Sequence, residues 1–302
     1  MPFLKTRILS TFLLFTRFNS SNSKHLTLKT VLCGYGKTAQ HKTLRDICLE
    51  PGQVKNFGED AGFFTPEKII IADGVGGWRR QGVDPSHYSY EITRFLAENV
   101  DSTYLENLDL LHHVEANFEN IKGLQILGST TLLYAVLESK PDSATLNVYN
   151  LGDCMLVIVR NKKVIYSSGT QQAKFNFPYQ LSSHGNFKPS QATIDKIELE
   201  NGDLIVSGSD GFWDNVFEEE VVEFLENGTV DLSTDPWDLT DFLNLVSKRS
   251  DDESYCSPFC KNAREVAGKN WLGGKVDDTT LGISRVELLD ADKPDEVKNT
   301  EL

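Results

Sequence analysis

The chain has 302 residues, of which 39% are hydrophobic and 25% are charged, an ordinary composition for a soluble globular protein. Its net charge of −14 is uneven: residues 1–45 carry eight Lys or Arg and no acidic residue, so the remainder carries −22 (−14 less +8). Such an acidic body excludes nucleic acid as an expected partner, because phosphate backbones are bound by basic surfaces.

Residues 1–45 are expected to be a leader and linker rather than part of the fold. The segment "MPFLKTRILSTFLLFTRFNSSNSK" mixes basic, serine and apolar residues, which is typical of a mitochondrial transit peptide. A secretory signal is the alternative, since Ile8–Phe15 is a short apolar run, but no A-x-A-like cleavage site follows it. The run is far shorter than the ~20 residues of a membrane span. We predict a mitochondrial protein, with the matrix as the expected compartment.

The next elements in chain order are a buried strand and a helix. The apolar run that ends at Asp73, in "IIIADG", predicts the strand. The segment 83–100 predicts the helix, with Asp84 as its cap, Pro85 at the first helical position and apolar residues on one face.

Strands dominate the middle of the chain. Four apolar segments follow one another with short polar breaks and predict an antiparallel meander: 129–138, 144–151, 154–161 and 162–168. Two later strands are expected at 202–210 and 277–286, and two helices at 217–228 and 234–248. Runs of strands with helices set apart indicate an α+β sandwich in one domain, 46–289. The tail 290–302 is polar and is expected to be disordered.

The five cysteines form no recognisable framework. Their number is odd and their spacing scattered, which argues against a set of disulfides. Cys256 and Cys260 would supply half of a zinc site, but no second pair of Cys or His completes it. We expect all five to be free thiols.

Acidic residues recur at the ends of the predicted strands. Each one alone is explained as a turn residue, since Asp is common in turns. Together they suggest convergence, because a sandwich gathers its strand ends. The positions are Glu59 and Asp60, Asp73, Asp153, Asp210 and Asp214, and Asp277 and Asp278. Like charges at close range oppose folding unless a cation neutralises them, and oxygen ligands alone favour Mg²⁺ or Mn²⁺ over zinc.

A metal-dependent phosphoester hydrolase follows from such a cluster. Metal ions neutralise phosphoryl oxygens and lower the pKa of a bound water toward 7, so no protein nucleophile is needed. Competing motifs fail. A dinucleotide loop starting at Gly74 would need glycine where Arg79 stands. The Cys-x5-Arg spacing from Cys154 to Arg160 spans a predicted strand, which holds its ends roughly 20 Å apart.

Five segments together resemble the motifs of the metal-dependent serine/threonine protein phosphatases of type 2C, the PPM family. In order they are "GEDAGFF", "IIIADGVGG", "NLGDCMLVIVR", "IVSGSDGFWDNV" and "VDDTTLGI", and they span Gly58 to Ile283. The segments "ADGVGGWRRQGVDPSHYS" and "QQAKFNFPYQLS" are similar to the mitochondrial subgroup. The resemblance implies two packed antiparallel sheets with helices on both outer faces.

The resemblance also implies the site residues. Glu59, Asp73 and the carbonyl of Gly74 would hold one metal, and Asp73, Asp210 and Asp277 the other. Asp60 would orient the attacking water. Asp153 and Asp214, with Asp210, match a weaker third metal position. A hydroxide bridging the two metals would attack phosphorus in line, and Asp60 and Asp73 are therefore the expected catalytic residues.

Three positions depart from the family pattern. Lys55 stands where many members carry an arginine that grips the substrate phosphate, and Lys lacks the bidentate fork of Arg. Arg79 or its neighbour Arg80 is expected to compensate in phosphate binding, with Arg79 as the named candidate. Val75 replaces a histidine proposed as general acid, a role typically worth 10²–10⁴-fold. Asp278 replaces the usual asparagine and adds a negative charge.

The expected function is Mg²⁺- or Mn²⁺-dependent removal of phosphate from serine or threonine of mitochondrial proteins. Two ions are expected, with a possible third. Two alternatives stay open: a catalytically weak member that binds phosphoproteins or acts as a scaffold, and a phosphatase for small metabolites. The expected partners are phosphorylated proteins, with no nucleic acid and no membrane span, and the sequence leaves the oligomeric state open.

Overall fold

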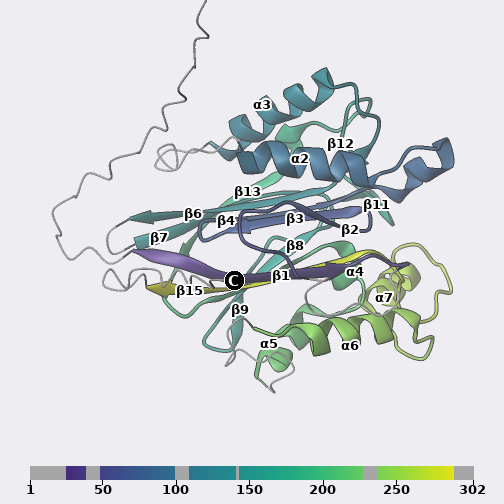
Figure 1. Cartoon of the computed structure of the whole chain (residues 1–302). Helices are drawn as coiled ribbons and strands as arrows, with labels where there is room; N and C mark the ends of the chain where they lie inside the picture. The colour runs from purple at the N-terminus through teal and green to yellow at the C-terminus, as the bar shows by residue number, and fades with distance from the viewer. Residues whose placement is uncertain (1–24, 39–47, 99–108, 141–142, 227–236, 289–302) are drawn as a thin grey trace, which may run out of the picture.

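The computed structural model describes residues 25–38, 48–98, 109–140, 143–226 and 237–288. Its strands form two larger antiparallel sheets that lie face to face (Figure 1). The five-stranded sheet has the order β1 (Leu26–Tyr35), β15 (Thr279–Leu288), β14 (Leu204–Gly208), β8 (Met155–Arg160) and β9 (Lys163–Ser167). The six-stranded sheet has the order β13 (Thr193–Leu199), β7 (Ser143–Leu151), β6 (Leu132–Lys140), β4 (Lys68–Asp73), β3 (Asp60–Thr65) and β2 (Lys55–Phe57).

Helices cover the outer face of each sheet, as expected for this fold class (Figure 1). α2 (Ser86–Glu98) and α3 (Leu110–Gly123) pack on the six-stranded sheet. α4 (Asp210–Trp213), α5 (Glu218–Glu226) and α6 (Thr240–Asp251) pack on the five-stranded sheet. The remaining elements are α7 (Pro258–Glu265), the 3-10 turns η1 (Gly76–Gln81) and η3 (Pro189–Gln191), and the short pairs β10 (Gln172–Lys174) with β11 (Phe177–Pro178) and β5 (Ser129–Thr130) with β12 (Leu181–Ser182).

The two sheets and the helices on their outer faces form four structural layers, and three apolar layers lie between them. One lies between the two sheets and contains Leu32, Ile69 and Leu156, and the other two lie under the outer helices. A strand with one face on each of two apolar layers becomes apolar throughout. This explains why "IIIA" in β4 shows no alternation: Ile69 and Ile71 face the other sheet, and Ile70 and Ala72 face α2 and α3.

The expected meander is wrong at its centre. β6 pairs with β7, and β8 pairs with β9, but β7 and β8 belong to different sheets. The chain changes sheet at Gly152, whose φ of 110° suits glycine, and whose Cβ would lie 2.6 Å from a methyl carbon of Thr131. Buried strands look alike whichever sheet they join, so periodicity could not detect this crossing.

The domain also begins earlier than the expected boundary at residue 46. β1 lies within the segment predicted to be leader and linker, yet it pairs with β15 along its whole length, from Leu26 opposite Leu288 to Tyr35 opposite Thr279. Its apolar side chains enter the core, with Leu28 and Leu32 buried. The basic composition of the first 45 residues concealed this strand. Residues 1–24, which hold most of the predicted transit peptide, lie outside the described residues, as does the tail 289–302.

Other predicted elements keep their type and shift at their ends. The helix expected at 83–100 is α2, and the amide of Ser86 donates to the Asp84 carboxylate (3.1 Å). The helix expected at 234–248 begins only at Thr240; the Asp235–Pro236 start predicted for it lies outside the described residues. Among the described helices, none is long and apolar enough to cross a membrane.

One pair of cysteines corrects the expectation of free thiols. Cys33 in β1 and Cys48 form a disulfide, and their backbones also form an isolated bridge. The two cysteines are 15 positions apart, and this spacing gave no sign of the pairing, because it depends on where the chain returns after β1. Cys154, Cys256 and Cys260 are free, as predicted.

Candidate metal centre

The predicted carboxylates meet at one end of the sandwich. Asp60 opens β3 and Asp73 closes β4, and the antiparallel register places the two residues opposite each other. Asp210 opens α4 directly after β14, and Asp277 precedes β15. Because antiparallel neighbours alternate in direction, residues at the start of one strand and the end of the next share an edge.

These carboxylates form two groups, in each of which the oxygens lie within 4.8 Å of one another. One group contains Asp73, Asp153 and Asp210, and the other contains Glu59, Asp277 and Asp278. The arrangement implied by the resemblance divides them differently, with Asp73 shared between Glu59 and the Asp210–Asp277 pair. The two groups are joined by the backbone, since the Gly74 amide donates to the Glu59 carbonyl (3.2 Å).

Gly74 is required by this close approach. A Cβ atom there would lie 2.6 Å from the Glu59 carbonyl oxygen and 2.8 Å from that of Pro85. Both obstacles are backbone atoms, so a side chain would force the two strand ends apart. The glycine therefore maintains the spacing between Glu59 and Asp73.

Asp60 is fully buried and fixed from one side only. Its Oδ2 accepts hydrogen bonds from Ser209 Oγ (2.6 Å) and Thr280 Oγ1 (2.8 Å). Among the residues that the structure describes, Asp60 Oδ1 and Asp153 Oδ1 are buried without a hydrogen-bond partner. Buried acceptors of this kind are costly unless a donor or cation completes them.

Two lysines that the sequence analysis did not single out lie among the carboxylates. Lys37 Nζ is 2.7 Å from Glu59 Oε2, 3.1 Å from Asp277 Oδ1 and 3.2 Å from Asp278 Oδ2. Lys275 Nζ contacts Asp210 and lies 2.8 Å from Asp214 and 3.2 Å from Asp277. Lys275 had a sequence signal, two residues before Asp277 in a polar loop. Lys37 had none, because its position depends on β1.

Asp278 shows how the extra negative charge is accommodated. Its Oδ1 accepts the backbone amide of Lys37 (2.8 Å). Lys37 thus contacts the Asp278 carboxylate through both its backbone amide and its side-chain ammonium. Burial nevertheless raises the pKa of Asp278, although Lys37 acts against that shift.

The carboxylates of the centre differ in the direction in which their surroundings shift the pKa. Burial, followed by repulsion from Asp210, holds the pKa of both Asp73 and Asp153 well above the ordinary value. Burial raises the pKa of Asp214 to about 7, with Lys275 opposing the shift. Burial would also raise the pKa of Asp277, but Lys275 and Lys37 bring it below its ordinary value.

The residues expected to bind phosphate lie in different places. Arg79, in η1, has its side chain 60% exposed and forms an ion pair with Glu59. Lys55 pairs with Gly62 in the β2–β3 ladder, and its Nζ donates to the Cys48 carbonyl (3.1 Å). Val75 is half-buried next to the cluster and offers no proton.

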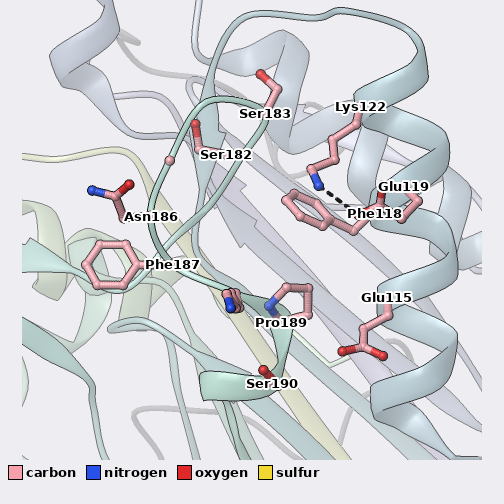
Figure 2. A pocket seen from close by; sticks show the side chains of 12 residues that line it. Glu115, Phe118, Glu119, Lys122, Ser182, Ser183, Asn186, Phe187, Pro189 and Ser190 are labelled. Atoms are coloured by element: carbon pink, nitrogen blue, oxygen red, sulfur yellow. Dashed lines mark hydrogen bonds and ion pairs between the residues drawn. The ribbon is translucent and has the colours of Figure 1, made fainter.

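Two pockets differ in their relation to the cluster. The smaller, of about 360 Å³, is lined by Asp153 and Asp214 and by Pro258 of α7. The larger, of about 650 Å³, lies between α3 and the segment 182–190, and its lining includes none of the clustered carboxylates. Figure 2 shows this larger pocket, with Lys122 paired to Glu119 at one wall. The smaller pocket is therefore the one that opens onto the site.

Comparison with known proteins agrees with this geometry. The chain is 32% identical over 255 residues to the probable protein phosphatase 2C 26 of Arabidopsis thaliana, covering 78% of this chain and 80% of that protein. This chain belongs to the protein phosphatase 2C family. It is also 29% identical over 291 residues to the protein phosphatase PTC7 homolog of Xenopus laevis, covering 90% and 93% of the two chains. A scan against models of protein families matches none.

Solved structures confirm the fold and the enzyme class. The photosystem II phosphatase PBCP has a TM-score of 0.63 and 26% identity, with 87% of this chain and 99% of that one covered. The catalytic domain of the serine/threonine phosphatase PstP, solved with two manganese ions, has a TM-score of 0.53 and 16% identity, with 87% and 99% covered, and so supports the fold. The chain is a serine/threonine protein phosphatase.

Proposed function

We propose that this phosphatase hydrolyses phosphoserine and phosphothreonine in mitochondrial proteins, with Mg²⁺ or Mn²⁺ held by the two carboxylate groups at the sandwich end. The observation that carries the metal assignment is the meeting of six acidic side chains in two compact groups. Mutual repulsion on this scale makes the cluster costly without cations. Relatives named as 2C phosphatases, and one solved with two manganese ions, support the same assignment.

The donor set fits hard divalent ions. The clustered side chains offer oxygen alone, which favours Mg²⁺ and Mn²⁺. Asp153 belongs to the same group as Asp73 and Asp210. Its Oδ1 is a buried acceptor without a hydrogen-bond partner among the described residues. When bound, the ions supply the positive charge that polarises the phosphoryl group and lowers the pKa of the attacking water.

The remaining chemistry falls to residues of the chain. Ser209 and Thr280 fix Asp60 through Oδ2, so that Oδ1 is available to accept a hydrogen bond from the attacking water. Arg79 lies at the exposed rim beside Glu59 and is placed to meet the phosphate. Since Val75 supplies no proton to the leaving group, turnover is expected to be modest.

Lys37 is better placed than Lys55 to bind the substrate phosphate. Its side chain is 31% exposed, and its ammonium lies within 3.2 Å of carboxylates from Glu59, Asp277 and Asp278. A phosphate bound at the cluster would therefore be adjacent to this ammonium. Lys55 donates instead to the Cys48 carbonyl.

The decisive experiment measures Mn²⁺-dependent phosphate release from a phosphothreonine peptide and from an aryl phosphate. Wild type, Asp73→Ala and the surface control Glu119→Ala are compared. We expect metal-dependent release from the peptide in wild type and the control, and its loss in Asp73→Ala. Absence of release from either substrate would favour the scaffold alternative. Release from the aryl phosphate and small metabolites, but not from the peptide, would favour the metabolite phosphatase.

The mitochondrial part of the proposal rests on the basic, serine-containing leader and on the likeness of two motifs to the mitochondrial subgroup. A fluorescent protein carrying residues 1–45 is expected to enter mitochondria, and the full chain lacking residues 1–24 is expected to stay outside. Entry of the shortened chain, or secretion of the fusion, would contradict this assignment.

A further inference from the structure

Two free cysteines lie close together at the start of α7. Cys256 Sγ and Cys260 Sγ are 3.1 Å apart, and Cys256 is exposed while Cys260 is buried. A disulfide bond measures about 2.05 Å, so an approach of about 1 Å would join the two sulfurs. The phosphatase reaction uses neither thiol.

The surroundings give the two thiols different roles. Cys256 is exposed to solvent, and its Sγ lies 3.7 Å from the Arg264 guanidinium. Cys260 Sγ faces inward and contacts the carbonyl of Trp271 (3.4 Å). Cys256 is therefore the thiol that reacts with an oxidant, and Cys260 is the thiol that then attacks the oxidised Cys256 sulfur.

The segment carrying these thiols contacts the metal centre directly. The Phe259 amide, between the two cysteines, donates to the Asp214 carbonyl (3.1 Å). The Phe259 ring lies 5.3 Å from Lys275 Nζ, measured to the ring centroid. Pro258 lines the pocket that opens onto Asp153 and Asp214. A shift in the first turn of α7 is thus transmitted to three residues of the cluster.

We propose that Cys256 and Cys260 form a thiol–disulfide modification site, oxidised by peroxide, and that its oxidation weakens metal binding at the neighbouring carboxylates. Cys256 first attacks the peroxide O–O bond, giving a sulfenic acid and one water. The Cys260 thiol then attacks that sulfur, forming the S–S bond and releasing a second water. Two thiols are oxidised and one peroxide is reduced. The thiol–disulfide site is independent of the phosphatase reaction, whereas its effect on metal binding rests on the metal site proposed above.

The weakening follows from the change at the turn between the two cysteines. Forming the S–S bond removes the Cys260 S–H that donates to the Trp271 carbonyl, and closing the 3.1 Å sulfur–sulfur gap pulls on the turn that contains Phe259. That turn holds Asp214 through one hydrogen bond and adjoins Lys275, so the carboxylate geometry changes. Coupling energies between such sites typically correspond to affinity changes of about 5–150-fold. We expect the oxidised protein to bind Mn²⁺ at least about fivefold more weakly.

The test uses full-length wild type, Cys256→Ser and Cys260→Ala, each treated with a small excess of hydrogen peroxide. Peptide mapping without reduction is expected to link residues 256 and 260 in wild type alone. Cys260→Ala is expected to stop at a sulfenic acid that dimedone labels at Cys256. The Cys33–Cys48 disulfide is common to all three proteins, so differences between them report on the proposed pair.

Calorimetric titration with Mn²⁺ supplies the second readout. Oxidised wild type is expected to lose affinity, a reductant is expected to restore it, and peroxide is expected to leave Cys256→Ser unchanged. Wild type in which Cys256 is overoxidised, or stays reduced, without linking to Cys260 would overturn the modification site. Equal Mn²⁺ affinity of the linked and reduced forms would overturn its coupling to the metal centre. Neither readout depends on catalytic activity.

Discussion

At the scale of single residues, the centre is a balance of buried charges. Lys37 and Lys275 each contact three carboxylates, and Asp277 contacts both lysines. Removing one partner from such a buried network leaves the others uncompensated, which is more costly than the pair is worth. Replacing either lysine is therefore expected to change the charge balance of the cluster.

Lys37→Met is expected to raise KM for the phosphopeptide and the inhibition constant of inorganic phosphate by about 10-fold or more, because a charge-assisted hydrogen bond contributes about 1.5–3 kcal/mol. Lys37→Arg should restore most of the loss. The matched control Lys55→Met should change either constant by less than about threefold. Steady-state kinetics at saturating Mn²⁺ measure all of these values. If Lys37→Met only tightens Mn²⁺ binding and leaves phosphate inhibition unchanged, Lys37 is a counter-ion and not a phosphate ligand.

Asp214 predicts a pH dependence of metal binding. Its pKa of about 7 lies above the ordinary value, so the folded, metal-free protein keeps a proton there until the pH rises through 7. A metal that takes this carboxylate must displace the proton, and affinity therefore rises with pH between about 6 and 8. In Asp214→Asn the slope of log affinity against pH should fall by up to one.

The measurement is calorimetry of Mn²⁺ binding at several pH values in buffers of different protonation enthalpy. Asp252→Asn is the matched control, because hydrogen bonds from Ser254 hold the pKa of that exposed carboxylate below its ordinary value. An unchanged slope in Asp214→Asn would show that the released protons come from other carboxylates.

At the scale of elements, backbone contacts decide where the carboxylates stand. Gly211, in the short helix α4, packs against the loop that leads into β15. A Cβ there would lie 2.0 Å from the carbonyl oxygen of Asp278. The sequence "SDGFWD" identified the acidic residues on either side, but the need for glycine at this position arises from a neighbour 67 positions away.

Gly211→Ala is accordingly expected to separate α4 from the start of β15, to lower kcat/KM by at least about tenfold and to destabilise the fold by about 1–3 kcal/mol, as overpacking does. Gly123→Ala is the matched control. It lies at the end of α3 with nothing within 4 Å of the added Cβ, and alanine in a helix is favoured by roughly 0.5–1 kcal/mol over glycine. Urea denaturation and phosphopeptide kinetics measure both effects. Equal behaviour of the two variants would contradict the role assigned to the α4 contact.

At the scale of the whole molecule, function opposes stability. The domain places many carboxylates together at one end of a strongly acidic chain. Burial and mutual repulsion raise the pKa values of Asp60, Asp73 and Asp153, so the charged forms of these residues destabilise the fold. A carboxylate whose folded pKa is raised stabilises the fold at low pH, where it is protonated, and this contribution is lost as the pH rises toward that pKa. The metal-free protein should therefore be less stable at neutral pH than at low pH, and Mn²⁺ should raise its free energy of unfolding.

Asp73→Asn tests whether this metal-binding carboxylate lowers the stability of the metal-free protein. In EDTA, the variant should be about as stable as wild type near pH 4 and more stable at pH 7.5, by about 0.5–2 kcal/mol, the usual gain when a destabilising functional group is replaced. With Mn²⁺ at 100 times its Kd, wild type should gain about 2.7 kcal/mol and the variant much less. Urea denaturation at the two pH values gives these free energies. A variant that is less stable than wild type at pH 7.5 in EDTA would show that Asp73 is not strained.

The sequence by itself determined the chemistry of this protein: oxygen ligands at strand ends, the order of five motifs, and the α+β class. These features are local, since a strand end and the turn residue after it are neighbours in the chain. The tertiary structure alone decided which carboxylates share a group, that β7 and β8 part between two sheets, and that β1 brings Lys37 to the site and Cys33 to Cys48. The physical reason is that buried strands are apolar on both faces, so their sequences do not identify their partners.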